Sequence, residues 1–287
     1  MTASSGVLVL ERPSSRVVVA AHLGGAIREF QWHAQDVLRP AAGDAVSDPF
    51  AMACFPMVPF VNRVAHGRFG FAGRAVQLER NWSEDAHPIH GQGWRASWNV
   101  TASDATSATL RFEGGGDDWP WRYASEQSFR LSARGLSIEL SLENLSSASM
   151  PSMLGLHPYF PQAARARLQA QLPRVWRTDH AALPAQETET PEAWRFEPAR
   201  PLDAVALDHC FSGWNGHAVL EWPERIITLR APRCAFLHVY APRGRDFFCI
   251  EPQSGPAGAL ARDAHEASIL APGERIAIDV HFEVAAR

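Results

Sequence analysis

The chain has 287 residues, of which 46% are hydrophobic and 20% are charged, and its net charge is −4. This composition is typical of a globular protein and argues against disorder. All 27 basic residues are arginines, which excludes Schiff-base catalysis by lysine and a P-loop lysine. Because the charge balance is acidic and no arginine run offsets it, nucleic acid is a poor candidate partner.

The sequence carries no sign of export or of membrane insertion. Within residues 1–15 there is one short apolar stretch without a basic lead, unlike a secretory signal. No segment reaches the roughly 18 to 20 uninterrupted apolar residues that a transmembrane helix needs. The four cysteines are scattered, and we expect small buried residues rather than a disulfide or zinc framework. These features predict a cytoplasmic protein that is free in solution.

The hydrophobic pattern alternates with a period of two wherever it can be read, which is the signature of half-buried strands. In chain order, the pattern predicts strands at residues 17–20, 109–112, 136–142, 219–222, 226–229, 236–240, 247–250 and 276–284. Spread among them are 20 Gly and 21 Pro, as expected for many short strands joined by turns. We predict a turn at residues 114–116 and an irregular excursion over residues 182–201.

The expected architecture is therefore all-β. We predict one large antiparallel β-sandwich, formed as a single domain over residues 1–287. Strands follow one another without the helical stretches that parallel crossovers require, which argues against a doubly wound sheet.

Several polar residues stand in stiff or apolar contexts in the first half of the chain. Asn62 and Arg63 follow an apolar stretch, and the Arg63 guanidinium could bind a planar or polyhydroxylated group. The alternative for Arg63 is a salt bridge or a packing contact. His90 precedes Gly91, which would allow a close backbone approach. His87 and His90 could be half of a metal site, but no third ligand follows at a characteristic spacing.

Three further candidates lie in the second half of the chain. His157 is flanked by apolar residues and followed by a proline, and it could equally be a core histidine bonded to a carbonyl. Asp208 could simply cap a turn. Glu251 follows the predicted strand 247–250, and partial burial there would raise its pKa toward the range of a general base. The ordinary alternative for Glu251 is an edge charge that reaches solvent.

Taken in order, these residues resemble the signature series of the aldose 1-epimerase (mutarotase) family. The series consists of Asn62-Arg63, His90-Gly91, the segment 155–160 that contains HPYF, Leu207-Asp208 and Glu251-Pro252. The resemblance covers nearly the whole chain, from about residue 17 to the terminal strand. It implies a large antiparallel β-sandwich that interconverts the α and β anomers of free aldoses without a metal or cofactor.

The resemblance also implies a role for each site residue. Glu251 would be the general base at the anomeric hydroxyl, and His157 the general acid at the ring oxygen. Arg63, His90 and Asp208 would bind sugar hydroxyls, with Asn62 beside them. A monosaccharide would be the only partner that the sequence implies, and the oligomeric state stays open. We expect Trp82, Trp94 and Trp98 to be core residues rather than platforms for a sugar.

The sequence departs from the family pattern at two places. After His90 it continues Gln92-Gly93-Trp94 where many relatives have a different short turn. His238 stands near the position of a substrate-contacting glutamine in some relatives, in a loosely aligned segment. One branch of the family acts on sugar phosphates and usually has a proline-rich segment with a tryptophan where this chain has residues 55–63. This difference argues against a sugar phosphate as substrate, although the arginines at 243–245 keep that branch open.

Two other functions remain open at this point. A non-catalytic sugar-binding β-sandwich could use the same pocket, but it would need neither Glu251 nor His157 as a proton carrier. A glycoside hydrolase or lyase would need a second catalytic carboxylate, for which Asp208 is the one candidate.

Overall fold

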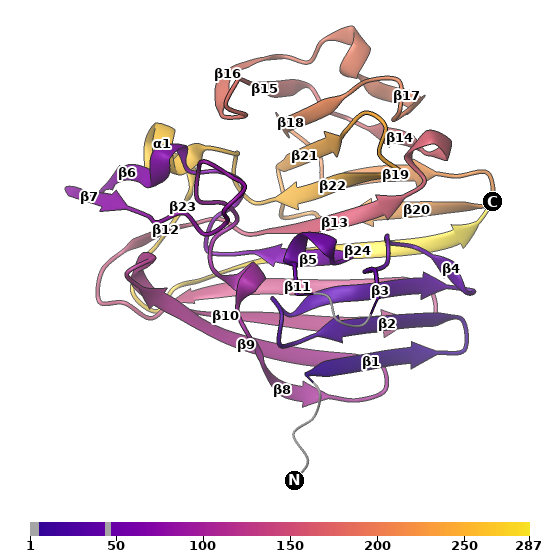
Figure 1. Ribbon diagram of the computed structural model, residues 1–287, viewed down its shortest axis with the longest axis horizontal. Helices are drawn as coiled ribbons and strands as arrows, with labels where there is room; N and C mark the ends of the chain where they lie inside the picture. Colours follow the sequence, from indigo (N-terminus) through magenta and orange to yellow (C-terminus); the bar gives the residue numbers. More distant parts are fainter. Residues whose placement is uncertain (1–5, 44–46) are drawn as a thin grey trace.

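The computed structural model describes residues 6–43 and 47–287, and it consists almost entirely of antiparallel strands in two large sheets (Figure 1). The first sheet contains, in spatial order, β1 (Val7–Arg12), β2 (Ser15–Ala20), β3 (Ala26–Trp32), β5 (Cys54–Met57), β13 (Gly155–Pro161), β22 (Phe247–Gln253), β21 (Phe236–Ala241), β18 (Leu207–Ser212), β15 (Arg174–Thr178) and β16 (Pro184–Glu189), with β4 (Gln35–Asp36) paired to β3. The second sheet contains β17 (Phe196–Pro201), β14 (Arg167–Ala170), β19 (His217–Glu221), β20 (Arg225–Arg230), β24 (Arg275–Ala286), β11 (Gly135–Asn144), β10 (Trp119–Ser132), β9 (Ser107–Gly116) and β8 (Asn99–Ser103).

Smaller elements complete the structure. Two small two-stranded sheets stand outside the main sheets: the hairpin of β6 (Arg68–Phe71) with β7 (Arg74–Gln77), and the pair of β12 (Met150–Ser152) with the distant strand β23 (Ser268–Leu270). One short helix, α1 (Ala259–Asp263), lies beside β6 and β7 at one end of the molecule. None of the helices in the described part of the chain is long and apolar enough to cross a membrane.

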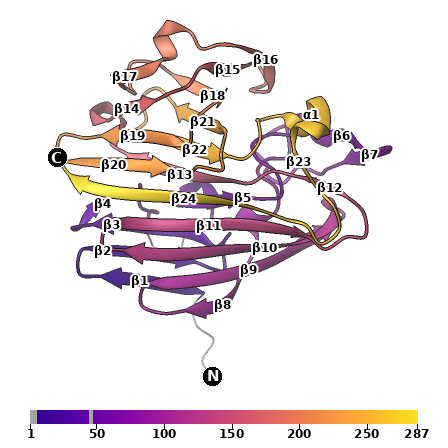
Figure 2. The same cartoon turned by 180° about the vertical axis from the view of Figure 1, so that it is seen from behind.

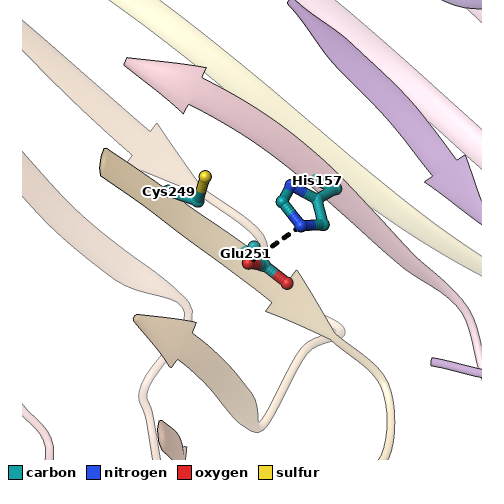
Figure 3. A group of neighbouring side chains, drawn as sticks. All are labelled: His157, Cys249 and Glu251. Carbon is teal, nitrogen blue, oxygen red and sulfur yellow. Dashed lines mark ion pairs between the residues drawn. The ribbon is translucent and has the colours of Figure 1, made fainter. Parts of the chain in front are cut away.

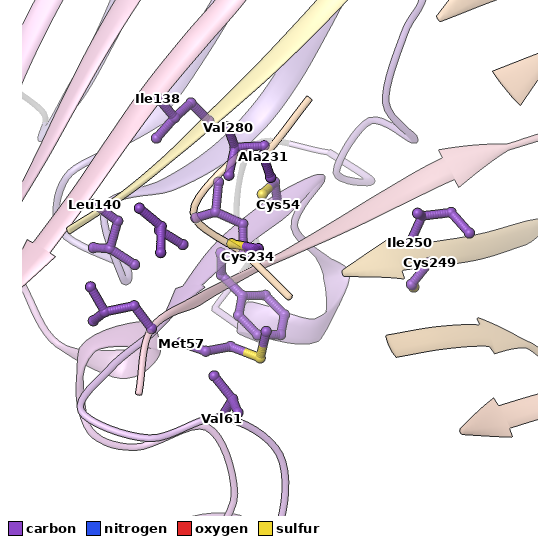
Figure 4. Close-up of a cluster of buried hydrophobic side chains, with 14 of the residues drawn as sticks. Cys54, Met57, Val61, Ile138, Leu140, Ala231, Cys234, Cys249, Ile250 and Val280 are labelled. Atoms are coloured by element: carbon purple, nitrogen blue, oxygen red, sulfur yellow. The ribbon is translucent and has the colours of Figure 1, made fainter. Parts of the chain in front are cut away.

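The two sheets pack face to face with their strands running in similar directions, as the views from opposite sides show (Figures 1 and 2). Aromatic rings join the two layers. The Phe282 ring of β24 lies 6.4 Å from Phe30 of β3 and 6.3 Å from Phe160 of β13, measured between ring centroids. Side chains from both sheets fill the same core, among them Met57 and Ile250 of the first sheet and Ile138, Leu140 and Val280 of the second (Figure 4). The core of this β-sandwich therefore lies between the sheets.

All eight predicted strands are present, because strict alternation of apolar and polar residues leaves few other ways to bury one face. The structure extends most of them by one to four residues at an end, and β19 ends one residue earlier than predicted. The prediction of an antiparallel β-sandwich is confirmed. The four cysteines are buried and free of disulfides, as expected.

Two local predictions were wrong. Residues 114–116 are not a turn but the end of β9, and the turn follows at residues 117–118. Gly114 is required there because it lies opposite Tyr123, and a Cβ at position 114 would come within 2.3 Å of that ring. The segment 182–201 is not an irregular excursion, since it contains β16 and β17, which pair with β15 and β14. These strands are stabilised by their partners rather than by a local hydrophobic pattern.

Candidate active site

A cavity of about 510 Å³ lies on the face of the first sheet that points away from the second sheet. This volume is in the usual range for small-molecule sites. All six predicted site residues line it, together with residues that were not predicted for the site. The cavity is lined by Arg39, Asp48, Phe50, Ala51, Asn62, Arg63, Trp82, Glu84, Ile89, His90, His157, Tyr159, Asp208, His238, Tyr240, Arg245, Phe247 and Glu251.

Strands β13 and β22 form the floor of the cavity and place His157 opposite Glu251. The register pairs Gly155 with Gln253 and Tyr159 with Cys249, and the ladder is interrupted between these two pairs. Pro158 and Pro252 fall in the interrupted stretch and have no backbone N–H to donate. Strand alternation turns these prolines toward the core and turns His157 and Glu251 toward the cavity.

The side chains of these two residues meet on the cavity floor (Figure 3). His157 Nε2 lies 3.4 Å from Glu251 Oε1, and both residues are buried. Glu251 was expected to end its strand, but β22 continues to Gln253. The carboxylate is therefore more deeply buried than a strand-end residue would be, and its second oxygen accepts a hydrogen bond from Gln253 Nε2 at 3.4 Å.

Burial shifts the pKa values of this pair in opposite directions. It raises the pKa of Glu251 to about 7, although the charge of His238 opposes the shift. It lowers the pKa of His157 to about 3, and the charge of His238 adds to this effect. Burial disfavours the charged form of each group. At neutral pH, His157 is therefore a neutral imidazole, and Glu251 is near the midpoint of its titration.

A second buried pair, His238 and Asp208, lies next to Glu251. His238 of β21 is the direct strand partner of Glu251, and its Nε2 lies 2.8 Å from Asp208 Oδ1. Burial alone would lower the pKa of His238, but the charge of Glu251 and the hydrogen bond to Asp208 outweigh it and raise the pKa to about 10. Burial likewise acts to raise the pKa of Asp208, but His238 lowers it to about 2. This pair is charged at neutral pH.

Two loop segments place the remaining predicted residues on the cavity wall. The His90 N–H donates to the Asn62 carbonyl at 3.1 Å, which joins segment 58–63 to segment 89–91. Asn62 and His90 both have left-handed backbone conformations, with φ of 53° and 57°. Such conformations are costly for residues other than glycine and often occur at functional sites. Asn62 Nδ2 lies 3.4 Å from His238 Nδ1, so the loop also contacts the second buried pair.

Arg63 is fixed by a carboxylate that sequence reasoning did not identify. Its Nε donates to Asp85 Oδ2 at 2.8 Å, and the other oxygen of Asp85 accepts from the His87 N–H at 2.9 Å. The salt bridge that was named as an alternative for Arg63 therefore exists, yet the same side chain still lines the cavity. One contact orients the guanidinium, and the rest of the group faces the cavity.

Aromatic side chains form the apolar part of the cavity. The rings of Phe55 and Tyr159 lie 4.5 Å and 4.7 Å from the His157 ring, which holds the imidazole in place. Trp94 and Trp98 are core residues, as expected. Trp82 is only partly buried: it packs against the core and also lines the cavity, where its ring lies 4.1 Å from Phe50 between ring centroids.

The histidine pair considered as half of a metal site does not converge. His87 Nδ1 accepts a hydrogen bond from the His66 N–H at 3.1 Å, whereas His90 faces the cavity. Within residues 6–43 and 47–287, the one cluster of three possible metal ligands is His157, Cys249 and Glu251, with ligand atoms within 4.8 Å of one another (Figure 3). Burial raises the pKa of the Cys249 thiol well above its usual value, so the thiolate that would bind a metal is disfavoured.

Sequence reasoning left His238 out of the predicted site and did not consider Arg39, Tyr159 or Asp85. The alternating strand 236–240 was the available signal for His238, because alternation places it on one face with Tyr240. Tyr159 could have been found in the same way, two residues after His157. Arg39 and Asp85 lie in irregular segments, where the sequence gives no orientation.

Comparison with known proteins agrees with this fold. The sequence profile described as aldose 1-epimerase matches residues 6–283. YphB, an uncharacterized protein of Escherichia coli strain K12, is 33% identical over 273 residues, which are 91% of this chain and 93% of YphB. A crystal structure from Escherichia coli K12, provisionally described as an aldose 1-epimerase, superposes with a TM-score of 0.91 at 31% identity, covering 98% of this chain and 99% of that one. A galactose mutarotase-like protein of Clostridium acetobutylicum has the same fold, with a TM-score of 0.87 at 17% identity over 98% of this chain and 95% of that one. The chain belongs to the aldose 1-epimerase family.

Proposed function

We propose that the protein is an aldose 1-epimerase that interconverts the α and β anomers of an aldose by opening and reclosing its ring. One observation carries the proposal: His157 Nε2 and Glu251 Oε1 lie 3.4 Å apart on the floor of a cavity of suitable size. Ring opening needs one group that accepts a proton and one that donates a proton, on either side of the anomeric carbon. This pair supplies both groups.

Glu251 accepts the proton of the anomeric hydroxyl, and His157 donates a proton to the ring oxygen. The bond between C1 and the ring oxygen breaks as the carbonyl forms. The free aldehyde then rotates about the C1–C2 bond, and the reverse transfers close the ring on its other face. Arg63, His90 and Asp208, with Asn62 beside them, hold the hydroxyls during the rotation, and Arg63 stabilises negative charge that develops on oxygen.

The pKa shifts make each group more reactive in its charged form. A carboxylate with a pKa raised to about 7 is a stronger base than an ordinary glutamate. An imidazolium with a pKa lowered to about 3 is a stronger acid than an ordinary histidine. The reactive form has Glu251 as a carboxylate and His157 protonated, and it is one arrangement of a pair that shares a single proton.

Two observations argue against the other functions. A hydrolase would need Asp208 as its second catalytic carboxylate, but the hydrogen bond to His238 holds the pKa of Asp208 at about 2, so this residue is ionised at neutral pH and cannot be a proton donor. A binding protein would gain nothing from burying a histidine and a glutamate in contact, because burial disfavours both charges. No observation favours either function over the epimerase.

Polarimetry of freshly dissolved α-glucose and α-galactose tests the proposal, with the buffer rate subtracted. We expect Glu251→Gln and His157→Asn each to lower kcat by about 10²- to 10⁴-fold, the usual contribution of one proton transfer. Glu143→Gln, in β11 of the other sheet, is the control and should keep the wild-type rate. A wild-type rate equal to the buffer rate for every aldose would refute the proposal.

A further inference from the structure

One end of the cavity is basic and aromatic. Arg39 follows β4, and its side chain lies over Tyr159 and Phe247, with the guanidinium carbon 4.1 Å and 4.8 Å from the two ring centroids. Its Nη2 donates to the carbonyls of Phe50 and Met52 at 2.9 Å and 3.0 Å. These contacts hold the guanidinium rigidly at the cavity wall.

The guanidinium of Arg39 is not part of an ion pair. Within the described ranges 6–43 and 47–287, no carboxylate lies within 4.0 Å of it. Asp48 lines the same cavity and favours the charged form of Arg39 from a longer distance, while its carboxylate accepts the Phe50 N–H at 2.9 Å. Two N–H groups of Arg39 are used by carbonyls, and the others have no acceptor among the residues that the structure describes. A half-buried guanidinium with free donors is suited to bind an anion.

A second arginine lies at the same end. Arg245 is in the loop between β21 and β22, is exposed, and lines the cavity near Tyr240 and Phe247. Along β22, Phe247 precedes Glu251 by four residues, so this basic end is displaced from the reacting pair along the strand direction. Arg245 has no ion pair within the described part of the chain either.

The basic end of the cavity lies where the terminal group of a bound hexose would extend. Tyr159 follows His157 by two residues on the same face of β13, and the Arg39 N–H donates to the Tyr159 carbonyl at 2.8 Å. In the proposed function, His157 serves the ring oxygen. The carbon that carries the terminal group of a hexose is bonded next to that oxygen. A terminal group that extends past His157 therefore comes toward Tyr159 and Arg39.

We propose that the preferred substrate is an aldose with an anionic terminal group, and that Arg39, assisted by Arg245, determines this specificity. The group is a carboxylate, as in a hexuronate, or a phosphate, because a guanidinium binds both. This inference rests on the proposed function, since that function sets the orientation of the sugar. A purely structural Arg39 would serve the carbonyls of Phe50 and Met52 but would leave its other N–H groups without an acceptor among the described residues.

The test compares kcat/KM for glucuronate and galacturonate with the values for glucose and galactose, with glucose 6-phosphate as a separate arm. We expect the best anionic aldose to exceed its neutral counterpart by at least about tenfold, as one charged hydrogen bond allows. The carboxylate and phosphate arms show which group is bound. Arg39→Met should lower this ratio by about 10- to 100-fold, and Arg245→Gln should lower it less, because Arg245 is more exposed.

The matched control is Arg243→Gln, an exposed arginine in the same loop that does not line the cavity. It should leave the ratio within about twofold. Thermal melting of Arg39→Met checks its folding, and Arg39→Lys, which keeps the charge, should retain part of the preference. The inference would be overturned if the wild type had nearly equal kcat/KM values for the anionic and the neutral aldose. It would also be overturned if Arg39→Met lowered kcat/KM equally for both sugars.

Calorimetry with Glu251→Gln separates this inference from the proposed function, because it measures binding without turnover. We expect glucuronate or glucose 6-phosphate to bind at least about tenfold more tightly than glucose. If no aldose is turned over but this preference in binding persists, the epimerase proposal fails and the specificity inference stands. If aldoses are turned over with no anionic preference in either assay, only the inference fails.

Discussion

Burial of a glutamate and a histidine in contact gives each of them a reactivity that neither has in water. Glu251 and His157 have little access to solvent, and burial makes both charged forms less stable. A less stable carboxylate is a better base, and a less stable imidazolium is a better acid. The neighbouring pair of His238 and Asp208 carries balanced charges, so it can contact the sugar without acting as a proton carrier.

The proposed proton transfers predict how activity depends on pH. The reacting pair must share one proton, and this state extends from the lower pKa of about 3 to the upper pKa of about 7. We therefore expect kcat/KM to be level between about pH 5 and pH 6.5 and to fall above pH 7, approaching tenfold per pH unit. Polarimetry in a series of buffers, each corrected for its own catalysis, measures this profile.

A rise of kcat/KM above pH 7, instead of a fall, would be equally informative. If Glu251 alone were required as a carboxylate, kcat/KM would rise through pH 7 instead of falling. Such a result would remove His157 from the role of proton donor, while Glu251 could remain the base. The Glu143→Gln variant should follow the wild-type profile at every pH.

At the scale of elements, the short contact between segments 58–63 and 89–91 sets the cavity wall. Gly91 has φ of +75°, and a Cβ there would lie 2.1 Å from the Val58 carbonyl oxygen. We expect Gly91→Ala to lower the free energy of unfolding by at least about 3 kcal/mol, because it combines a strained backbone with a steric clash. Urea denaturation measures this change. Activity should also fall, since His90 is the adjacent residue.

Gly73 is a matched control because it separates the strained backbone from the steric clash. Its φ is +76°, nearly the same as that of Gly91, but no atom lies within 4 Å of its would-be Cβ. We expect Gly73→Ala to cost only about 1 to 2 kcal/mol, the usual price of a left-handed alanine. Equal losses for the two variants would show that the contact with Val58 does not constrain the wall.

The sequence predicted elements well where strands alternate and poorly where they depend on a partner. Strand β11 was predicted because its apolar residues alternate strictly. Strands β16 and β17 were missed because their burial comes from pairing with β15 and β14. Within the site, His157 and Glu251 were proposed from a family pattern. Arg39 could not be, because no periodicity orients a side chain in an irregular segment.

At the scale of the whole molecule, the site depends on the packing of the two sheets against each other. The strand that carries His157 presents Phe160 to the core, and the strand that carries Glu251 presents Phe248, whose ring lies 5.4 Å from that of Phe160. The second sheet supplies Phe282 against Phe160 at 6.3 Å. The position of the reacting pair on one face is therefore fixed by aromatic packing on the other face.

Phe282 tests this dependence because it lies in β24, a central strand of the second sheet, and contacts the first sheet. We expect Phe282→Ala to lower the free energy of unfolding by about 3 to 5 kcal/mol, the usual cost of removing a buried phenylalanine ring. Ile269→Ala, at a position that is 37% exposed, should cost less than about 1 kcal/mol. If the sheets form one cooperative unit, urea transitions followed by tryptophan fluorescence and by far-UV circular dichroism should move together to a lower midpoint. Separate midpoints in Phe282→Ala would show instead that each sheet unfolds independently, and that the floor of the cavity does not need the second sheet.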